Sequence, residues 1–565
     1  MKYSLLADMY EMLDSKSGKL DKTHIIADLL KSTSTELLPS VVLLLNGSVF
    51  PAWCEDELGV AGQLMIKSMS KAYGISEKDI VKEFKKSGDL GLATEKFSKS
   101  KKQTTLGSRE LSLEKVFENL QIIASQSGGG SQDRKMDLIA ELLIHASPNE
   151  AKYIVRTVLG QLRIGVAEGL IRDAIAEAFS VPVEKVEKAW SLNPDYGEIA
   201  RIAKEGEKGL DGVKVQLGRP LMVQLAEKAP SLEEAINSFE NVALEYKYDG
   251  ARMLIHKKKD KIWIFTRKLE NITDAFPDVK EACRKSLIKV DECIVDGEGI
   301  AINKKTGKPL PFQMLSQRIK RKYDVGETAI DIPMELNLFD IVYLNGKTTF
   351  DLSLKERRSI LSRIVKEIPG KIQLAKQLVT KDLKEAEKFY NEALNNGQEG
   401  LIVKDMDAKY LPNRRVAGGW LKVKPVLESL DLAITGGTWG TGKRAGWLGS
   451  FFLACRDPNT GDFLECGMMG TGVKEKESED GGVTFKELTK LLKPLIEFEK
   501  ENEVKITPKI VVEVSYEEIQ KSPTYLSGYA LRFPRLLRLR VDKGPEEADD
   551  LDRLDRIYKA QKGKR

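Results

Sequence analysis

The stretch Glu245-Tyr246-Lys247-Tyr248-Asp249-Gly250-Ala251-Arg252 decides how the middle of this chain is organised. It predicts a strand that ends in a turn presenting Lys247, and Gly250 would let the backbone approach a ligand closely. Residues 253–266 predict a β-hairpin that returns Arg267 to the same region. Taken alone the motif is weak, because a lysine in a surface turn is common. Its meaning depends on the segments between residues 295 and 424.

Four such segments occur in order, and each adds a group that nucleotide chemistry needs. They are Val295-Asp296-Gly297-Glu298-Gly299, Leu338-Phe339-Asp340-Ile341, Glu399-Gly400-Leu401-Ile402-Val403-Lys404 and Trp420-Leu421-Lys422-Val423-Lys424. The first places Glu298 at a strand end, and the second offers an aromatic face for a purine. The third adds another acid, and the last puts two lysines on one face of a strand. Together with Lys247 they supply a nucleophile, cations for a phosphate, acids for Mg²⁺ and a ring for a base.

The side chains available for catalysis are limited by composition. The chain has 3 histidines and 5 scattered cysteines without a CxxC pair, which disfavours histidine-based triads, zinc ribbons and disulfide frameworks. Catalysis must therefore rest on Lys, Arg, Asp and Glu. A lysine nucleophile must first lose its proton, and only about one lysine in a few thousand is a free amine at pH 7. A desolvated pocket with neighbouring cations and a metal favours that free amine.

Length and texture predict three domains in the 565 residues. Residues 1–217 show apolar positions at helical spacing and predict an all-α domain. Residues 218–424 alternate short β-type runs with helices, which predicts an α+β domain with mixed sheets. Residues 425–565 show short strands with one helix near 485–492, typical of an OB-type β-barrel, followed by a C-terminal helix.

Bulk properties fit a soluble protein of a reducing cytoplasm. There is no apolar run of about 18 residues and no signal peptide, so no membrane association is expected. The 90 basic residues exceed the 85 acidic ones by only five. This balance permits nucleic-acid binding without implying it, because such binding depends on whether basic side chains cluster on one face.

A segment with P-loop spacing, residues 437–443, is set aside. It continues with Arg444 where a P-loop has Ser or Thr, and the residues after it form a poor helix. A turn between barrel strands is the better interpretation.

The ordered motifs resemble those of the covalent nucleotidyltransferase superfamily, which contains ATP-dependent ligases and mRNA capping enzymes. Within it, the chain is similar to archaeal replicative DNA ligases and to the catalytic region of eukaryotic DNA ligase I. The likeness covers nearly the whole length, including residues 163–174 of the helical region (RIGVAEGLIRDA). Capping enzymes and most RNA ligases are not expected to carry that helical domain.

The resemblance implies a role for each motif residue. Lys247 would be the adenylated nucleophile, and Glu245 would read the adenine amino group while Phe339 stacks on the base. Arg252 and Arg267 would serve the ribose, the α-phosphate and the 5′-phosphate of a nick. The remaining assignments are Lys422 and Lys424 for the α-phosphate, and Asp249, Glu298 and Glu399 for the metal, with the two glutamates as alternative ribose ligands.

Two parts of the pattern carry further expectations. Arg414 and Arg415 lie side by side with one extra residue before Trp420, so either could contact the nucleotide, and Arg415 is favoured. The segment 530–535 (ALRFPR) resembles the last motif of the family, which lies over the ATP pyrophosphate in the first step. Arg532 and Lys543 are the residues expected to act there.

The implied function is sealing of nicks in duplex DNA during replication, repair and recombination, through a covalent lysine–AMP intermediate. ATP would donate the adenylate, with Mg²⁺ as cofactor and Mn²⁺ as a substitute. Nicked double-stranded DNA would be the partner of a monomeric, cytoplasmic, nucleoid-associated enzyme, with a sliding clamp as a further candidate. Two alternatives stay open: an RNA-directed nucleotidyltransferase and an inactive DNA-binding protein. An NAD-dependent ligase is disfavoured because no four-cysteine zinc module is present.

Overall fold

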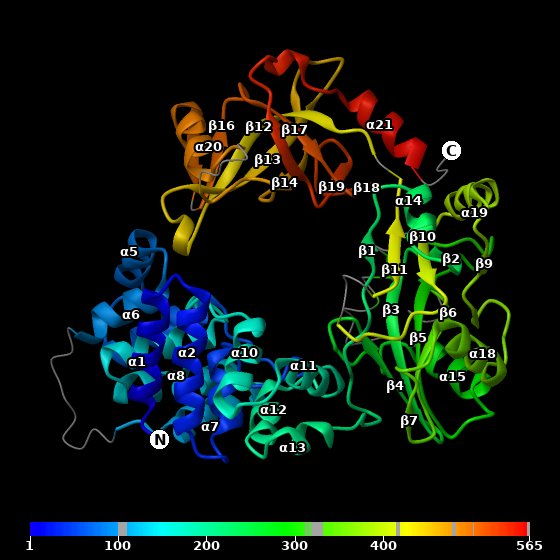
Figure 1. The fold of residues 1–565 in the computed structure, drawn as a ribbon. Coiled ribbons are helices and arrows are strands. Elements are labelled where there is room, and N and C mark those ends of the chain that lie inside the picture. The colour runs from blue at the N-terminus through cyan, green and yellow to red at the C-terminus, as the bar shows by residue number, and fades with distance from the viewer. Residues whose placement is uncertain are drawn as a thin grey trace. The chain divides into compact units, whose positions relative to one another are not determined.

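The computed structural model describes residues 1–565 except 100–109, 311–313, 316–317, 319–331, 414–417, 426, 477–481, 501 and 562–565. The chain forms two compact units (Figure 1). One unit contains Met1–Glu83 and Leu90–Lys424, and the other contains Phe84–Asp89 and Pro425–Arg565. Arg414 and Arg415 lie outside the described residues.

The N-terminal third is helical in its described part, as the apolar periodicity predicts. Its helices are α1 (Tyr3–Ser15), α2 (Lys19–Ser32), α3 (Leu38–Leu45), α4 (Gly62–Tyr73), α5 (Glu77–Ser87), α6 (Leu90–Lys99), α7 (Leu113–Ser125), α8 (Ser131–His145), α9 (Pro148–Val158), α10 (Glu168–Phe179), α11 (Val183–Leu192), α12 (Tyr196–Ala203) and α13 (Glu207–Asp211). Local signals set the start of α9, where Ser147 and Glu150 form a reciprocal capping box and Pro148 is the first helical residue.

Two mixed sheets form the middle of the chain. The five-stranded sheet has the order β1-β11-β10-β2-β9, and the six-stranded sheet has the order β4-β3-β5-β6-β7 with β8 paired to β6. The strands are β1 (Glu227–Lys228), β2 (Val242–Lys247), β3 (Ala251–Lys258), β4 (Lys261–Thr266), β5 (Glu292–Ala301), β6 (Met334–Leu344), β7 (Lys347–Thr348), β8 (Ile372–Leu374), β9 (Gln377–Val379), β10 (Gly400–Asp405) and β11 (Trp420–Val423). The helices among them are α14 (Leu232–Asn237), α15 (Pro277–Ser286), α18 (Leu354–Ile364) and α19 (Leu383–Asn395).

The sheets are mixed, as predicted, because β1 pairs with β11 and β6 with β8 in parallel while the other ladders of these two sheets are antiparallel. One local expectation is wrong. Glu298 does not end a strand, since β5 continues to Ala301 and pairs with both β3 and β6 around it.

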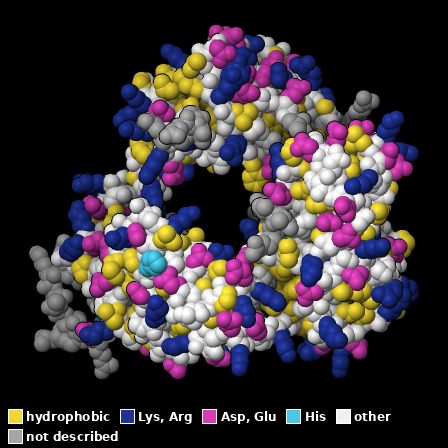
Figure 2. Space-filling model, in the orientation of Figure 1, with side chains coloured by type: hydrophobic (Ala, Val, Ile, Leu, Met, Phe, Trp, Pro, Cys, Tyr) yellow, Lys and Arg dark blue, Asp and Glu magenta, His cyan; other side chains and the backbone are white. Residues whose placement is uncertain are grey.

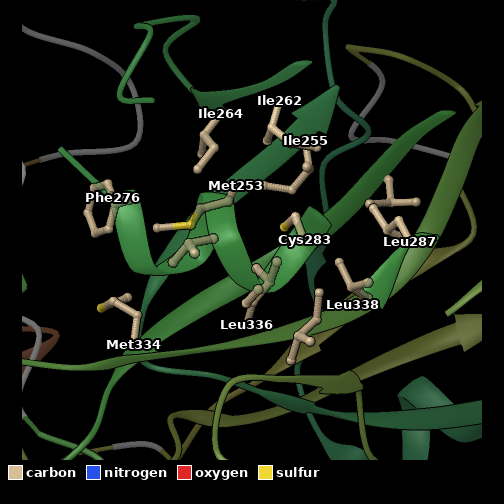
Figure 3. Close-up of a cluster of buried hydrophobic side chains, with 14 of the residues drawn as sticks. Met253, Ile255, Ile262, Ile264, Phe276, Cys283, Leu287, Met334, Leu336 and Leu338 are labelled. Atoms are coloured by element: carbon tan, nitrogen blue, oxygen red, sulfur yellow. The ribbon is translucent and has the colours of Figure 1, made fainter. Parts of the chain in front are cut away.

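A continuous apolar core holds α15 against the six-stranded sheet. Figure 3 shows Phe276, Cys283 and Leu287 turned toward Met253, Ile255 and the other labelled strand residues. Alternate residues of β3 and β6 supply the buried layer, as period-two packing requires. This core fixes the strands that carry the pocket on the opposite side.

The second unit is built on one branched antiparallel sheet. It contains β12 (Leu430–Trp439), β13 (Leu448–Arg456), β14 (Phe463–Met469), β15 (Ile496–Lys500), β16 (Glu503–Ile506), β17 (Val511–Ser515) and β20 (Arg535–Leu539), with the hairpin β18 (Glu518–Lys521) and β19 (Tyr529–Arg532) beside it. The helices are η1 (Gly442–Arg444), α20 (Phe485–Leu492), η2 (Lys493–Leu495), η3 (Pro545–Glu547) and α21 (Leu551–Ala560). The P-loop-like segment forms the end of β12 and the turn η1, with no α-helix directly after it.

Charged side chains of both signs mix on the visible face of the molecule. On the face in Figure 2, Lys and Arg lie interspersed with Asp and Glu.

Four of the five cysteines are buried and behave as small apolar residues: Cys283, Cys293, Cys455 and Cys466. Cys54 is half-buried. Within the described residues, no helix combines the length and apolar character needed to cross a membrane.

Candidate active site

A pocket lies between the five-stranded and six-stranded sheets of the middle region. The five-stranded sheet contributes residues of β2, β10 and β11, and the other sheet contributes residues of β3, β5 and β6. The lining residues are Ala226, Glu245, Tyr246, Lys247, Tyr248, Arg252, Glu298, Phe339, Ile402, Lys404 and Trp420. The structure thus brings together five predicted site residues from three separate segments of the sequence: Glu245, Lys247, Arg252, Glu298 and Phe339.

Strand register explains which side chains share the floor of this pocket. Glu245 lies opposite Ile402, and Ile402 lies opposite Lys422 on its other side. Directly paired residues project from the same face of a sheet, and so do residues two apart on one strand. Lys247 and Lys404 therefore join that face. Lys422 shares it but is not among the residues that line the pocket.

Lys247 and Glu399 are joined twice. The Lys247 ammonium donates a hydrogen bond to Glu399 Oε2, and the Glu399 backbone N–H donates to the Lys247 carbonyl at 2.9 Å. Lys424 Nζ lies 2.8 Å from the same Oε2. Burial raises the pKa of the Glu399 carboxyl, but Lys247 and Lys424 outweigh it and hold this pKa well below its usual range. Glu399 is therefore an ionised anchor shared by two lysines.

Gly400, the residue after Glu399, allows this close arrangement. Its φ is +137°, and a Cβ there would lie 2.2 Å from the Val423 carbonyl oxygen. A side chain could not fit without moving β11. The glycine thus lets β2, β10 and β11 bring Lys247 and Lys424 to one carboxylate.

Glu298 faces the same pocket from β5. Burial raises the pKa of its carboxyl to about 8, with Glu399 and Asp296 adding to the rise while Lys247 and Arg252 oppose it. A carboxyl in this state gains from a bound cation, since the positive charge offsets the cost of burying the ionised form.

The Arg252 guanidinium is hydrogen-bonded to the Asp296 carboxylate. Arg252 Nε and Nη2 donate to the two Asp296 carboxylate oxygens at 2.9 and 2.5 Å, and Nη1 donates to the Gln224 carbonyl at 2.5 Å. Tyr410 Oη also donates to Asp296 Oδ2, at 3.1 Å. Such a bidentate pair fixes the guanidinium plane at the pocket wall. Asp296 was not a predicted site residue, although it lies two positions before Glu298.

Lys404 is a second residue that the sequence interpretation did not assign to the site. Its ammonium is buried 2.5 Å from Glu245 Oε2, and it lies 4.5 Å from the Phe339 ring centroid and 4.3 Å from the Trp420 ring centroid. The available signal was its alternation with Ile402 on β10, which places both on one face.

Asp249 and Gly250 lie in the turn between β2 and β3. Asp249 is buried outside the pocket lining, and its backbone N–H donates to Gln398 Oε1 at 3.2 Å. A Cβ on Gly250 would lie 2.3 Å from the Gly299 carbonyl oxygen. The glycine therefore permits the close packing of this turn against β5. No group of three or more His, Cys, Asp or Glu in the described residues is arranged to hold a metal.

Three further predicted residues are not among those that line this pocket. Arg267 follows β4 and lines a separate depression with Lys268 and Leu269. Arg532, at the end of β19, lies 3.7 Å from Glu518 Oε2, and Lys543 Nζ donates to Asp431 Oδ2 at 2.7 Å. Both belong to the second unit.

Comparison with known proteins decides the family. Residues 2–176 match the DNA ligase N terminus family, 223–424 the ATP dependent DNA ligase domain, and 444–543 the ATP dependent DNA ligase C terminal region. The DNA ligase of Nanoarchaeum equitans is 48% identical over 100% of this chain and 99% of its own length. This chain belongs to the ATP-dependent DNA ligase family. The DNA ligase of Thermococcus onnurineus is 46% identical over 99% of this chain and 98% of its own length, and that of Archaeoglobus fulgidus is 43% identical over 99% of both.

The fold agrees with this membership. The solved structure Pmar-Lig_PreS3 superposes with a TM-score of 0.58 at 17% identity, covering 95% of this chain and 99% of that one. The architecture is an N-terminal helical domain, a central adenylation domain and a C-terminal domain with strands. The ligase uses ATP and seals nicks in DNA through an adenylated enzyme.

Proposed function

We propose that Lys247 is the residue of this ligase that becomes adenylated, and that the pocket around it binds the adenosine of ATP. The observation that carries the proposal is the double link between Lys247 and Glu399, with Lys424 on the same carboxylate. It fixes one lysine in the lining of a pocket that offers an aromatic ring, Phe339, and a polar edge, Glu245.

The first step follows from that arrangement. After the ammonium loses a proton, Lys247 Nζ attacks the α-phosphorus, an N–P bond forms, and the bond to the bridging oxygen breaks as pyrophosphate leaves. Because two lysines keep Glu399 ionised, we assign it to positioning Lys247 rather than to general-base catalysis. Lys422 and Lys424 would balance the charge that develops on the α-phosphate.

Glu298, which lines the pocket, and Glu399, which is bonded to Lys247 of the lining, are the two carboxylates that suit a divalent cation. Glu399 lies close enough to raise the pKa of Glu298, and Mg²⁺ is commonly held by one or two carboxylates plus substrate phosphates. When bound there, Mg²⁺ would supply charge stabilisation to the transferring phosphoryl group. Asp249, which like Glu399 lies outside the pocket lining, stays a further candidate ligand.

The later steps move AMP to the 5′-phosphate of a nick and then release it as the 3′-hydroxyl attacks. Arg252, fixed by Asp296, would present its remaining donor capacity and charge to these phosphates, and Arg415 or Arg414 would add a further cation. The helical domain and the second unit would contact the duplex mainly through phosphates, because a ligase must ignore sequence.

We also propose that the second unit is an OB-type barrel. Support comes from a bridge between Thr471, just after β14, and Arg535 of β20. β14 and β20 each end one branch of the sheet, so the bridge joins the ends of these two branches.

Labelling and sealing assays test the proposal. The protein is incubated with α-labelled ATP or GTP, and the covalent adduct is measured before nicked DNA or nicked RNA is added. We expect an adduct with ATP and sealing of the DNA nick. An adduct with GTP alone, or sealing of RNA alone, would instead support an RNA-directed enzyme. An absent adduct would support an inactive DNA-binding protein.

A further inference from the structure

Lys404 and Glu245 form a buried ion pair inside the pocket. The Lys404 side chain is 2% exposed and that of Glu245 is 3% exposed, with 2.5 Å between Nζ and Oε2. β10 and β2 carry the two residues on adjacent rows of one sheet face, since Lys404 pairs with Ala243 and Ile402 with Glu245. Both residues also line the pocket, so the pair lies where a base would enter.

The other groups around Glu245 are hydrogen-bond donors as well. Gln377 Nε2 donates to Glu245 Oε1 at 2.8 Å, and Arg358 Nη1 lies 3.9 Å from the same oxygen. Lys404 is the nearer of these two cations by more than an ångström. A buried carboxylate that loses its close cation tends to take up a proton, because an unpaired buried charge is costly. Lys404 is therefore the close counter-ion that compensates the buried Glu245 carboxylate.

Ionisation decides what the pocket edge can recognise. A carboxylate only accepts hydrogen bonds, whereas a protonated carboxyl also donates one. The exocyclic amino group of adenine is a donor, and guanine presents a carbonyl oxygen at the equivalent position. An ionised Glu245 thus accepts from adenine and repels guanine, and a protonated Glu245 would lose that distinction.

We infer that Lys404 is a specificity-determining, positioning residue, which acts through Glu245 to make the ligase choose ATP over GTP. The inference rests on the proposed adenine pocket. Lys404 also lies between Phe339 and Trp420, whose rings meet edge to face at 83°, and this cation–π contact orients the stacking ring. That contact alone would affect both purines similarly, so it does not explain a preference between them.

The test compares adduct formation with α-labelled ATP and GTP in the full chain. Lys404→Met removes the charge and keeps the length of the side chain. We expect the ratio of kcat/KM for ATP to that for GTP to fall at least about tenfold, mainly through a higher KM for ATP, equivalent to about 1.4 kcal/mol. Lys404→Arg, which keeps the charge, should retain more of the ratio than Lys404→Met.

A double variant separates the route through Glu245 from a general packing effect. Glu245→Gln removes the charge that Lys404 balances, so E245Q and E245Q/K404M should show the same ATP-to-GTP ratio. If K404M does not fold alone, this pair still decides the matter, because the double variant leaves no unpaired carboxylate. An unchanged ratio in K404M, or a further change from E245Q to E245Q/K404M, would overturn the inference. A wild-type protein without any adduct would instead contradict the proposed function.

Discussion

The ammonium of Lys247 and the carboxylate of Glu399 are hydrogen-bonded to each other, while the backbones of the same two residues are joined at 2.9 Å. The two residues are 152 positions apart in sequence. The side-chain contact therefore depends on the pairing of β2 with β10, and not on flexible side chains alone. This relationship makes Glu399 the residue whose replacement should most directly disturb the position of the nucleophile.

Replacing Glu399 tests that positioning role. In Glu399→Gln the amide cannot balance Lys247 and Lys424, so both ammonium groups repel each other and the nucleophile shifts. We expect adduct formation to slow roughly 100-fold, as misplacement by about 1 Å can produce. Single-turnover labelling with α-labelled ATP measures the rate. Glu387→Gln, at an exposed position of α19, is the matched control and should keep the wild-type rate.

The last family motif gives a prediction that separates the reaction steps. Arg532→Ala and Lys543→Ala should slow adduct formation severely, because these residues are expected to orient the pyrophosphate only in the first step. The same variants should still close a nick that already carries 5′-AMP. Glu298→Ala, Glu399→Ala and Lys422→Ala should impair both assays. Equal failure of the Arg532 and Lys543 variants on pre-adenylated nicks would assign those residues to DNA binding or folding.

The structure adds a folding control for Lys543. The Lys543 ammonium and Arg540 both pair with Asp431 Oδ2, and Arg540 Nη1 lies 2.5 Å from that oxygen. Lys543→Ala therefore leaves Asp431 paired with Arg540. Asp431→Asn removes the partner of both cations and should destabilise the second unit more than Lys543→Ala does. Thermal unfolding of each variant measures this order.

The helical domain gives a prediction about DNA. Residues 1–217, expressed alone, should bind duplex DNA without sequence preference and with strong salt dependence. If Z phosphates are neutralised, the slope of log affinity against log salt should be about −0.9Z. Fluorescence anisotropy at several salt concentrations measures it. A DNA affinity that does not change with salt concentration, or no DNA binding at low salt, would instead indicate a protein-interaction domain.

Much of the fold could be predicted because local patterns agree with tertiary packing. The helix at Phe485–Leu492 and the strand ending at Lys247 match the apolar periodicity and turn signals. The partners of the site residues could not be predicted in the same way. Arg252 meets Asp296 through β3–β5 register, and Gly250 packs against Gly299, because such contacts depend on long-range pairing that composition does not encode.

His256 makes the stability of the six-stranded sheet pH-dependent. Burial lowers its pKa to about 3 from 6.5, and Gly218 N–H donates to its Nδ1 at 3.3 Å. The unfolded chain therefore binds more protons between pH 6.5 and 3, so stability that is present above pH 6.5 falls as the pH drops. At pH 5 this loss is about 2 kcal/mol.

His256→Asn keeps a hydrogen-bond acceptor but removes the titrating group. Between pH 7 and pH 5, the free energy of unfolding of this variant should therefore fall by about 2 kcal/mol less than that of the wild type. Amide hydrogen exchange in β3 reports the opening of this sheet, once corrected for the pH dependence of intrinsic exchange. His145→Asn, at an exposed position, should behave as wild type. Equal acid sensitivity of His256→Asn and wild type would show that other groups cause the effect.

Mapping the adduct tests the central claim most directly. The protein is incubated with ATP and a divalent cation, digested, and its AMP-bearing peptide is sequenced by mass spectrometry, with Lys247→Ala and Lys247→Arg as controls. We predict AMP on Lys247 of the wild type, and no adduct in either variant, although both should still bind nicked DNA. AMP on any other lysine of the wild type would contradict the account.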